Sequence, residues 1–200
     1  MTATVFVFAK PPRMGLSKTR LARSLNRTEA RRIARFTLER SLKAASDPRW
    51  TAVISTAPAK SVWAEFTPSG RHLPRIPQGP GDLGDRLARA YEAAPRGPVI
   101  FIGGDTPNIS ARLIWRAIKA TKPGQVAVGP SRDGGFWLLG LWKGLKANHP
   151  FSEVRWSHPQ TLEDIMANVP VRVSVHRLPS LIDIDDADDW ATWTAASAFP

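Results

Sequence analysis

The alternation of short apolar runs with segments of helical periodicity is the feature that most restricts the fold of this chain. Apolar runs of strand length are expected to form buried strands at residues 5–8, 52–56, 99–102, 126–128, 136–141 and 171–175. Helical periodicity is expected at residues 61–66, 85–94, 110–121, 159–168 and 186–196, and in helices capped by Ser17 and Thr28. Such alternation predicts an α/β fold with a mainly parallel sheet covered on both faces.

The chain length fits one domain spanning residues 1–200. With 42% hydrophobic and 22% charged residues, the composition is that of a globular protein rather than a disordered one. The absence of cysteine excludes disulfides, a thiolate nucleophile and sulfur-ligated zinc. Without a membrane-length apolar run or a basic signal-peptide start, we expect a cytoplasmic protein that contacts no membrane, as a monomer or a homodimer.

The charge is unevenly distributed along the chain, whose formal net charge is +11. Residues 10–49 hold twelve Lys or Arg against three acids, whereas residues 180–200 hold five Asp and no Lys or Arg. This separation favours a site where phosphates meet a divalent cation, because Lys and Arg bind phosphate and carboxylates bind Mg²⁺ or Mn²⁺. The alternative is a non-catalytic nucleic-acid-binding protein. We expect no specific nucleic-acid partner, because no binding motif or basic stripe interleaved with aromatics is present.

The loop after the first strand carries the strongest phosphate-binding signal. Four cations lie between the strand and a predicted helix start: Lys10, Arg13, Lys18 and Arg20. A helix N-terminus favours anions, and Gly15 lets the backbone approach a ligand. The loop is not a P-loop, since Pro12 and Ser17 stand where that motif needs glycine. An exposed basic turn is the alternative interpretation.

Carboxylates follow other predicted strands, where α/β sheets bind their ligands. Asp105 ends the central strand and is a candidate metal ligand, with helix capping as the alternative. Asp183 and Asp185 would share one face of an extended segment and could reach the same cation. Asp133 lies in an Asp-Gly-Gly turn that could also be a plain hairpin.

Taken in order, these loops resemble one known family over nearly the whole chain. Lys10 to Leu21 matches its K-x-P-x-x-G-x-x-K-T-R-L opening, and Gly81 to Arg86 matches its G-D-L-G-x-R. Further matches are Asp105 with Pro107, Asp133-Gly-Gly, Trp156-Ser157 and Leu181 to Trp190. The family is the GT-A-like, glycosyltransferase-type transferases of bacteria in the nucleotide-diphospho-sugar transferase superfamily, some of them associated with radical-SAM or arsenosugar gene clusters.

The resemblance implies a single Rossmann-like, three-layer α/β/α domain of GT-A type with a mainly parallel mixed sheet. It also implies a transferase that uses a nucleoside diphosphate sugar and an unidentified small-molecule acceptor. Asp105, Asp183 and Asp185 would hold Mg²⁺ or Mn²⁺, with Asp133 and Lys18 catalytic. The donor would be bound by Lys10, Arg13, Gly15, Lys18, Arg20, Gln78, Asp82 and Arg86.

A second interpretation is a nucleotidyltransferase that transfers NMP from an NTP to a small phosphorylated or cofactor acceptor and releases pyrophosphate. Gly103 stands where a D-x-D motif has its first carboxylate. This pattern with a basic first loop is similar to the molybdenum-cofactor and phospholactate guanylyltransferases.

Overall fold

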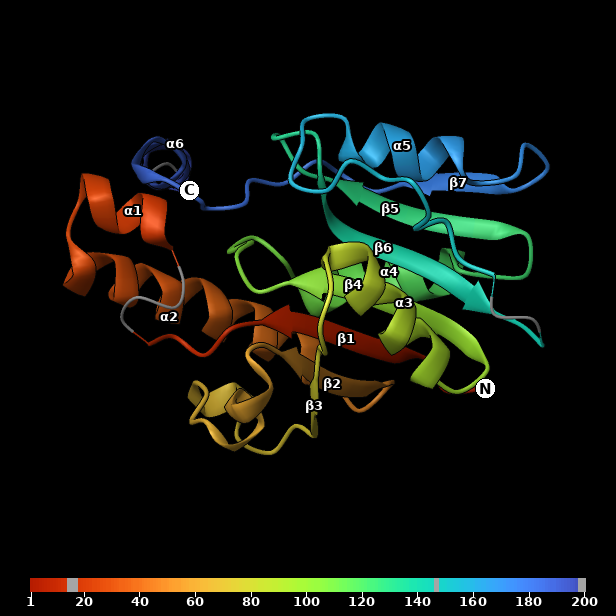
Figure 1. Cartoon of the computed structure of the whole chain (residues 1–200), viewed down its shortest axis with the longest axis horizontal. Helices are drawn as coiled ribbons and strands as arrows, with labels where there is room; N and C mark the ends of the chain where they lie inside the picture. The colour runs from red at the N-terminus through yellow and green to blue at the C-terminus, as the bar shows by residue number, and fades with distance from the viewer. Residues whose placement is uncertain (14–17, 146–147, 198–200) are drawn as a thin grey trace.

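In the part of the chain that the structure describes, seven strands form a single sheet in the order β3-β2-β1-β4-β6-β5-β7 (Figure 1). The computed structural model describes residues 1–13, 18–145 and 148–197. Only β6 runs antiparallel to its neighbours β4 and β5, so the predicted mainly parallel sheet is confirmed. The strands are β1 (Thr4–Ala9), β2 (Thr51–Thr56), β3 (Arg75–Pro77), β4 (Gly97–Gly103), β5 (Gln125–Pro130), β6 (Phe136–Lys143) and β7 (Ser174–Arg177).

Helices cover both faces of the sheet, because the central strands are apolar on both sides. Val7 and Ile100 pack in one core with α2 and α4, whereas Phe6 and Phe101 pack in a second core with α3 and α5. The three-layer α/β/α architecture follows from this alternation. The helices are α1 (Thr19–Ser24), α2 (Arg27–Ala45), α3 (Leu83–Ala93), α4 (Ala111–Ala120), α5 (Thr161–Ala167) and α6 (Ala187–Ser197), with short 3₁₀ turns η1 (Ala59–Trp63) and η2 (Pro68–Gly70).

A third apolar cluster, beside the sheet, joins α1 and α2 with the segment that contains α6. Leu21 of α1, Ile33 of α2, Ile184 and Trp193 of α6 are all buried together. Figure 1 shows α1 and α6 at one side of the molecule, beyond the ends of the strands, where they meet the first turns of α2, while the rest of α2 runs along the sheet. The basic N-terminal segment and the acidic C-terminal segment are therefore held next to each other.

Several predicted boundaries are wrong, each for a local reason. The strand expected at 171–175 forms instead at Ser174–Arg177, where pairing with β5 sets its position, and its residues are all exposed. β3 is not among the strands expected from the sequence; it is only three residues long and ends in proline. Asn26 rather than Thr28 caps α2, and its side chain accepts the N–H of Glu29. The helix expected at 61–66 is the 3₁₀ turn η1.

The loops with candidate functional residues lie at the carboxyl-terminal end of the parallel strands. β1, β2, β3, β4, β5 and β7 all end there, and antiparallel β6 begins there. The segments after β1, β3, β4, β5 and β7 carry every candidate residue of the sequence analysis. None of the helices among the described residues combines the length and apolarity needed to cross a membrane.

Candidate functional site

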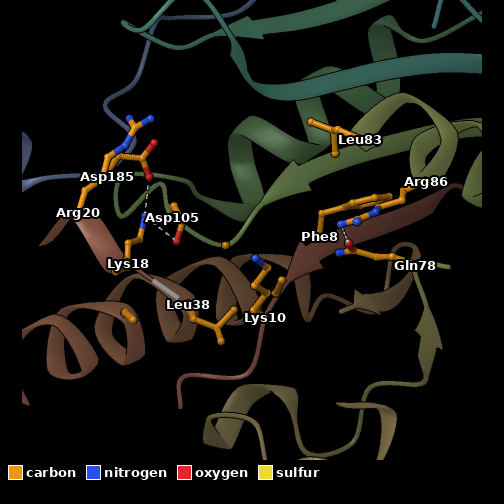
Figure 2. Close-up of a pocket in the computed structure, with 13 residues that line it drawn as sticks. Phe8, Lys10, Lys18, Arg20, Leu38, Gln78, Leu83, Arg86, Asp105 and Asp185 are labelled. Carbon is orange, nitrogen blue, oxygen red and sulfur yellow. Dashed lines mark hydrogen bonds and ion pairs between the residues drawn. The ribbon is translucent and has the colours of Figure 1, made fainter. Parts of the chain in front are cut away.

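A cavity of about 380 Å³ opens at the carboxyl-terminal end of the parallel strands, and charged side chains from distant segments line it (Figure 2). Its apolar wall includes Phe8, Leu38 and Leu83. Its polar side chains are Lys10, Lys18, Arg20, Gln78, Arg86, Asp105 and Asp185. We call this space the first cavity.

Lys18 connects the two sides of the first cavity. Its Nζ lies 3.0 Å from Asp105 Oδ1 and 2.8 Å from Asp185 Oδ1 (Figure 2). The lysine side chain is only 4% exposed, while each carboxylate is about half exposed. Burial lowers the pKa of Lys18, but the two carboxylates outweigh burial and hold that pKa above its ordinary value. The cation is thus fixed as a charged group at the cavity wall.

Asp183 lies behind this ion pair in a drier position. Thr106 donates a hydrogen bond to its Oδ1, and the N–H of Ile184 donates to the carbonyl of Asp105 at 3.0 Å. Burial, together with the negative charges of Asp105, Asp133 and Asp185, raises the pKa of Asp183 to about 7, although the Thr106 hydrogen bond opposes this. Several carboxylates therefore converge on a small region with excess negative charge.

The loop before α3 is held by hydrogen bonds within itself. Gln78 is buried, donates through Nε2 to the carbonyl of Ser55 at 2.8 Å, and accepts from Arg86 at 3.3 Å. Arg86 Nε also donates to the carbonyl of Gly81 at 3.0 Å. The amide and the guanidinium thus face the first cavity in fixed orientations. Asp82, a candidate for nucleotide binding, caps α3 in a capping box with Asp85.

A second, smaller cavity of about 220 Å³ adjoins the first and shares the walls Phe8 and Leu83 with it. Asp133 and Asp183 both line this second cavity. Asp133 follows β5 and precedes β6, and its Oδ1 accepts the N–H of Gly135 at 3.0 Å. Gly134 has φ +85, and a Cβ there would lie 1.8 Å from the carbonyl oxygen of Pro159, so the turn packs tightly on the segment before α5.

The structure thus divides the sequence candidates into groups. The first cavity brings together Lys10, Lys18, Arg20, Gln78, Arg86, Asp105 and Asp185, and the second brings together Asp133 and Asp183. Arg13 is exposed and lines neither cavity, and Asp82 is also absent from both linings. Gly15 and the proposed cap Ser17 lie outside the described residues.

Sequence reasoning missed Thr106 and Ser131. Thr106 is buried and holds Asp183, and its position beside Asp105 at a strand end was a usable signal. Ser131 is buried and lines the second cavity. Only its position two residues before Asp133 hinted at such a role, because a single serine after a strand is common in turns.

The carboxylates fit a hard divalent cation by their chemistry. Mg²⁺ and Mn²⁺ prefer oxygen ligands, and Asp105, Asp183 and Asp185 bring such ligands into one region, where burial and the neighbouring carboxylates raise the pKa of Asp183. Among residues 1–13, 18–145 and 148–197, however, no three His, Asp or Glu side chains form a ready ligand set. Lys18 supplies the positive charge between two of the three aspartates.

Solved structures with the same fold span this chain almost completely. A protein from Desulfovibrio desulfuricans G20, provisionally described as a nucleotide-diphospho-sugar transferase, matches with a TM-score of 0.82 and 23% identity over 100% of this chain and 89% of that chain. A nucleotidyl transferase from Methanothermobacter thermautotroptrophicus matches with a TM-score of 0.66 and 15% identity, covering 98% and 97%. Rv0371C from Mycobacterium tuberculosis H37Rv, in complex with manganese, matches with a TM-score of 0.54 and 18% identity, covering 96% and 97%.

At these identities the likenesses establish the fold that the chain shares with these proteins, and nothing about its reaction. No curated protein matches the chain. The family described as "Uncharacterized protein conserved in bacteria (DUF2064)" matches residues 37–158, which is more than half of the chain and includes the α3 loop, Asp105 and Asp133. The chain therefore belongs to the DUF2064 family.

Proposed function

We propose that the protein is a metal-dependent transferase that uses a nucleoside diphosphate sugar as its donor. The observation that supports this most is the first cavity, where Lys10, Lys18, Arg20 and Arg86 are gathered beside Asp105 and Asp185. Cations that converge from separate segments suit a diphosphate, and adjacent carboxylates suit the cation that accompanies it. The fold shared with a provisionally described nucleotide-diphospho-sugar transferase agrees with this proposal.

The residues of the first cavity would bind and polarise the donor. Lys10, Lys18 and Arg20 would take up negative charge that grows on the leaving diphosphate, and such preorganised electrostatic groups are a major source of rate enhancement. Gln78 and Arg86 would contact the rest of the nucleotide from the opposite side. Asp105, Asp183 and Asp185 would hold Mg²⁺ or Mn²⁺, which would supply further positive charge to the diphosphate.

Asp133 would act on the acceptor as a general base. The acceptor hydroxyl gives its proton to the Asp133 carboxylate, and its oxygen forms a new bond to C1 of the donor sugar. The bond between C1 and the diphosphate oxygen breaks, and its electron pair leaves with the nucleoside diphosphate. The hydrogen bond from Gly135 orients the carboxylate for this role.

Nucleotidyl transfer is the second candidate, favoured by the single carboxylate at the end of β4, where Gly103 precedes Asp105 by two residues. In that reaction the acceptor oxygen bonds to the α-phosphorus of an NTP, and the bond to the β-phosphate bridge breaks with release of pyrophosphate. The same cations would then bind the β- and γ-phosphates. The likeness to a nucleotidyl transferase is consistent with this alternative.

Product analysis separates the two candidates. The protein with Mn²⁺ is incubated with a panel of sugar nucleotides and with the four NTPs, and release of nucleoside diphosphate and of pyrophosphate is measured. We expect nucleoside diphosphate from a sugar nucleotide and no pyrophosphate. Pyrophosphate release from an NTP would instead establish nucleotidyl transfer, and absence of both products together with no thermal stabilisation by any nucleotide would contradict both.

Substitutions of two arginines on α1 test whether the transfer reaction takes place in the first cavity. Arg20 and Arg23 are both exposed on α1, but only Arg20 lines the cavity. We expect Arg20→Ala to lower turnover by roughly 10²–10³-fold, the usual loss on removing one preorganised charge-stabilising group. Arg23→Ala should stay within about twofold of the wild type, and equal effects of the two substitutions would place the chemistry elsewhere.

A further inference from the structure

The second cavity contains a buried hydroxyl group that lacks a partner in the described part of the chain. Ser131 is 7% exposed, and its Oγ makes no hydrogen bond to any described residue. Its backbone is well held, because its N–H donates to the carbonyl of Gly135 at 3.1 Å. An unpaired buried hydroxyl typically costs about 1–3 kcal/mol, which a bound polar group can recover.

The space beside this hydroxyl is kept open by a glycine. A Cβ at Gly135 would lie 3.3 Å from Ser131 Oγ and 3.2 Å from Asp133 Oδ1, between the two polar groups. Because Gly135 has no side chain, Ser131 and Asp133 can both face a molecule in the cavity. Two separate hydrogen-bonding groups thus line the same small space.

The charges around the second cavity are opposite to those of the first. Asp133 and Asp183 line it, and His158 stands at its exposed mouth. None of the described residues that line it is Lys or Arg. A phosphorylated molecule would therefore face the Asp133 carboxylate with no lysine or arginine among the described residues of the lining, and like charges brought together in this way are unfavourable.

The remaining wall is apolar and aromatic. Phe8, Leu87, Phe101 and Phe136 also line the cavity. Binding sites of this kind bury the apolar face of a ligand and orient it by a few hydrogen bonds. The volume of about 220 Å³ lies below the range of roughly 300–1,000 Å³ typical of larger ligands, and so suits a small acceptor.

We propose that the second cavity is the acceptor subsite and that it selects an uncharged, hydroxyl-bearing molecule with an apolar face. Ser131 hydrogen-bonds one hydroxyl of this molecule, Asp133 faces the reacting hydroxyl, and the aromatic wall packs against its apolar face. Phosphorylated acceptors are rejected by Asp133. This inference rests on the proposed transferase function, because it assigns the second substrate of the same site.

Binding of three glucose derivatives to the wild-type protein tests the selectivity. Phenyl β-glucoside is neutral with an apolar ring, methyl β-glucoside is neutral without one, and glucose 6-phosphate is anionic. Titrations followed by ligand-observed NMR should give the tightest binding for phenyl β-glucoside and at least tenfold weaker binding for glucose 6-phosphate. Equal or tighter binding of the phosphate, or no binding of either glucoside, would overturn the inference.

Two serine variants assign the binding to this cavity. Ser131 and Ser41 are both buried with unpartnered hydroxyls, but Ser41 lies on α2 and lines neither cavity. Ser131→Ala should weaken phenyl β-glucoside about tenfold, whereas Ser41→Ala should leave its affinity unchanged. Equal affinity of wild type and Ser131→Ala would contradict the role of Ser131.

A nucleotide titration of the same proteins separates this inference from the proposed function. UDP, ADP, GDP and CDP with Mn²⁺ report on the first cavity, and their affinity should be the same for the wild type and both serine variants. If a nucleotide binds but no glucoside does, only the acceptor assignment fails. If glucosides bind as expected but no nucleotide does, the cavity assignment stands and the transferase proposal fails.

Discussion

Lys18 links segments that are far apart in the sequence. It has φ 56, in the left-handed region that costs a residue with a side chain roughly 1–2 kcal/mol. Its ammonium group lies between Asp105 and Asp185, and the latter is 167 residues away in the sequence. The ion pairs are consistent with the retention of this backbone conformation, which directs the side chain into the first cavity. The uneven charge distribution indicated that the basic and acidic segments meet, but it could not identify which pairs form.

The charged form of the Asp183 carboxylate is favourable only when a cation is bound beside it. Its pKa is about 7 in the folded protein and about 3.9 in an unfolded chain, so the folded state binds the proton more tightly. Stability of the metal-free protein should therefore fall as pH rises from about 4 to about 7, and remain lower above that. The Asp183→Asn variant keeps an oxygen that can accept from Thr106 and should lose this pH dependence.

Thermal unfolding in EDTA at pH 5 and pH 8 measures this effect. We expect Asp183→Asn to raise the Tm at both pH values, by several degrees more at pH 8 than at pH 5, since about 1 kcal/mol corresponds to roughly 2–4 °C in a chain of this size. Asp188→Asn, at the exposed start of α6, serves as the control. A lower Tm of Asp183→Asn at pH 8 would show that the charged carboxylate stabilises the fold.

At the scale of elements, the site depends on loops whose shape is set by a few contacts. The segment before α3 turns twice through glycines with positive φ, at Gly79 and Gly81. The groups that these glycines accommodate belong to the protein itself. A Cβ at Gly79 would meet the Arg89 guanidinium, and one at Gly81 would meet the Asp85 carboxylate of the capping box.

Gly81→Ala and Gly124→Ala should therefore differ, although both glycines have positive φ. A Cβ at Gly81 would lie 2.1 Å from Asp85 Oδ2, whereas nothing lies within 4 Å of one at Gly124. Gly124→Ala should cost only the backbone strain, about 1–2 kcal/mol. Gly81→Ala should cost about 1 kcal/mol more through loss of the helix cap. Urea unfolding of both variants compares these costs, and equal losses would show that the capping box adjusts freely.

Strands covered on both faces could be located from the sequence, whereas the edge strands were missed (β3) or misplaced (β7). β4 was found because residues 99–102 are apolar and fully covered by helices. β3 and β7 are the edge strands, and their exposed or half-buried residues carry no pattern that separates strand from loop. Edge position depends on pairing with a distant strand, which local sequence does not specify. The same reason explains why Ser131 and its cavity were missed, since the cavity forms only when the segments after β5 and before α5 meet.

At the scale of the whole molecule, the first cavity is assembled from both ends of the chain. β1 and α1 supply Lys10, Lys18 and Arg20, and the segment before α6 supplies Asp185. The apolar cluster of Leu21, Ile33, Ile184 and Trp193 holds these parts together outside the sheet. The positions of the charged residues therefore depend on apolar residues that do not themselves line the cavity.

Trp193 tests this dependence, because it touches the cluster but lines neither cavity. It is 9% exposed, stacks on Trp190 and donates its indole N–H to Asn108 at 2.9 Å. Trp193→Ala should cost about 3–5 kcal/mol, as truncation of a buried aromatic residue usually does, and so lower the Tm by roughly 10 °C. Because α1 and the segment before α6 would lose a shared support, Trp193→Ala should also weaken nucleotide binding, measured at a temperature well below its Tm.

Trp63 serves as the control: it is 88% exposed, and Trp63→Ala should change neither the Tm nor nucleotide binding. A destabilised Trp193→Ala that binds nucleotide as tightly as the wild type would mean that the ion pairs of Lys18 alone hold the two ends in place.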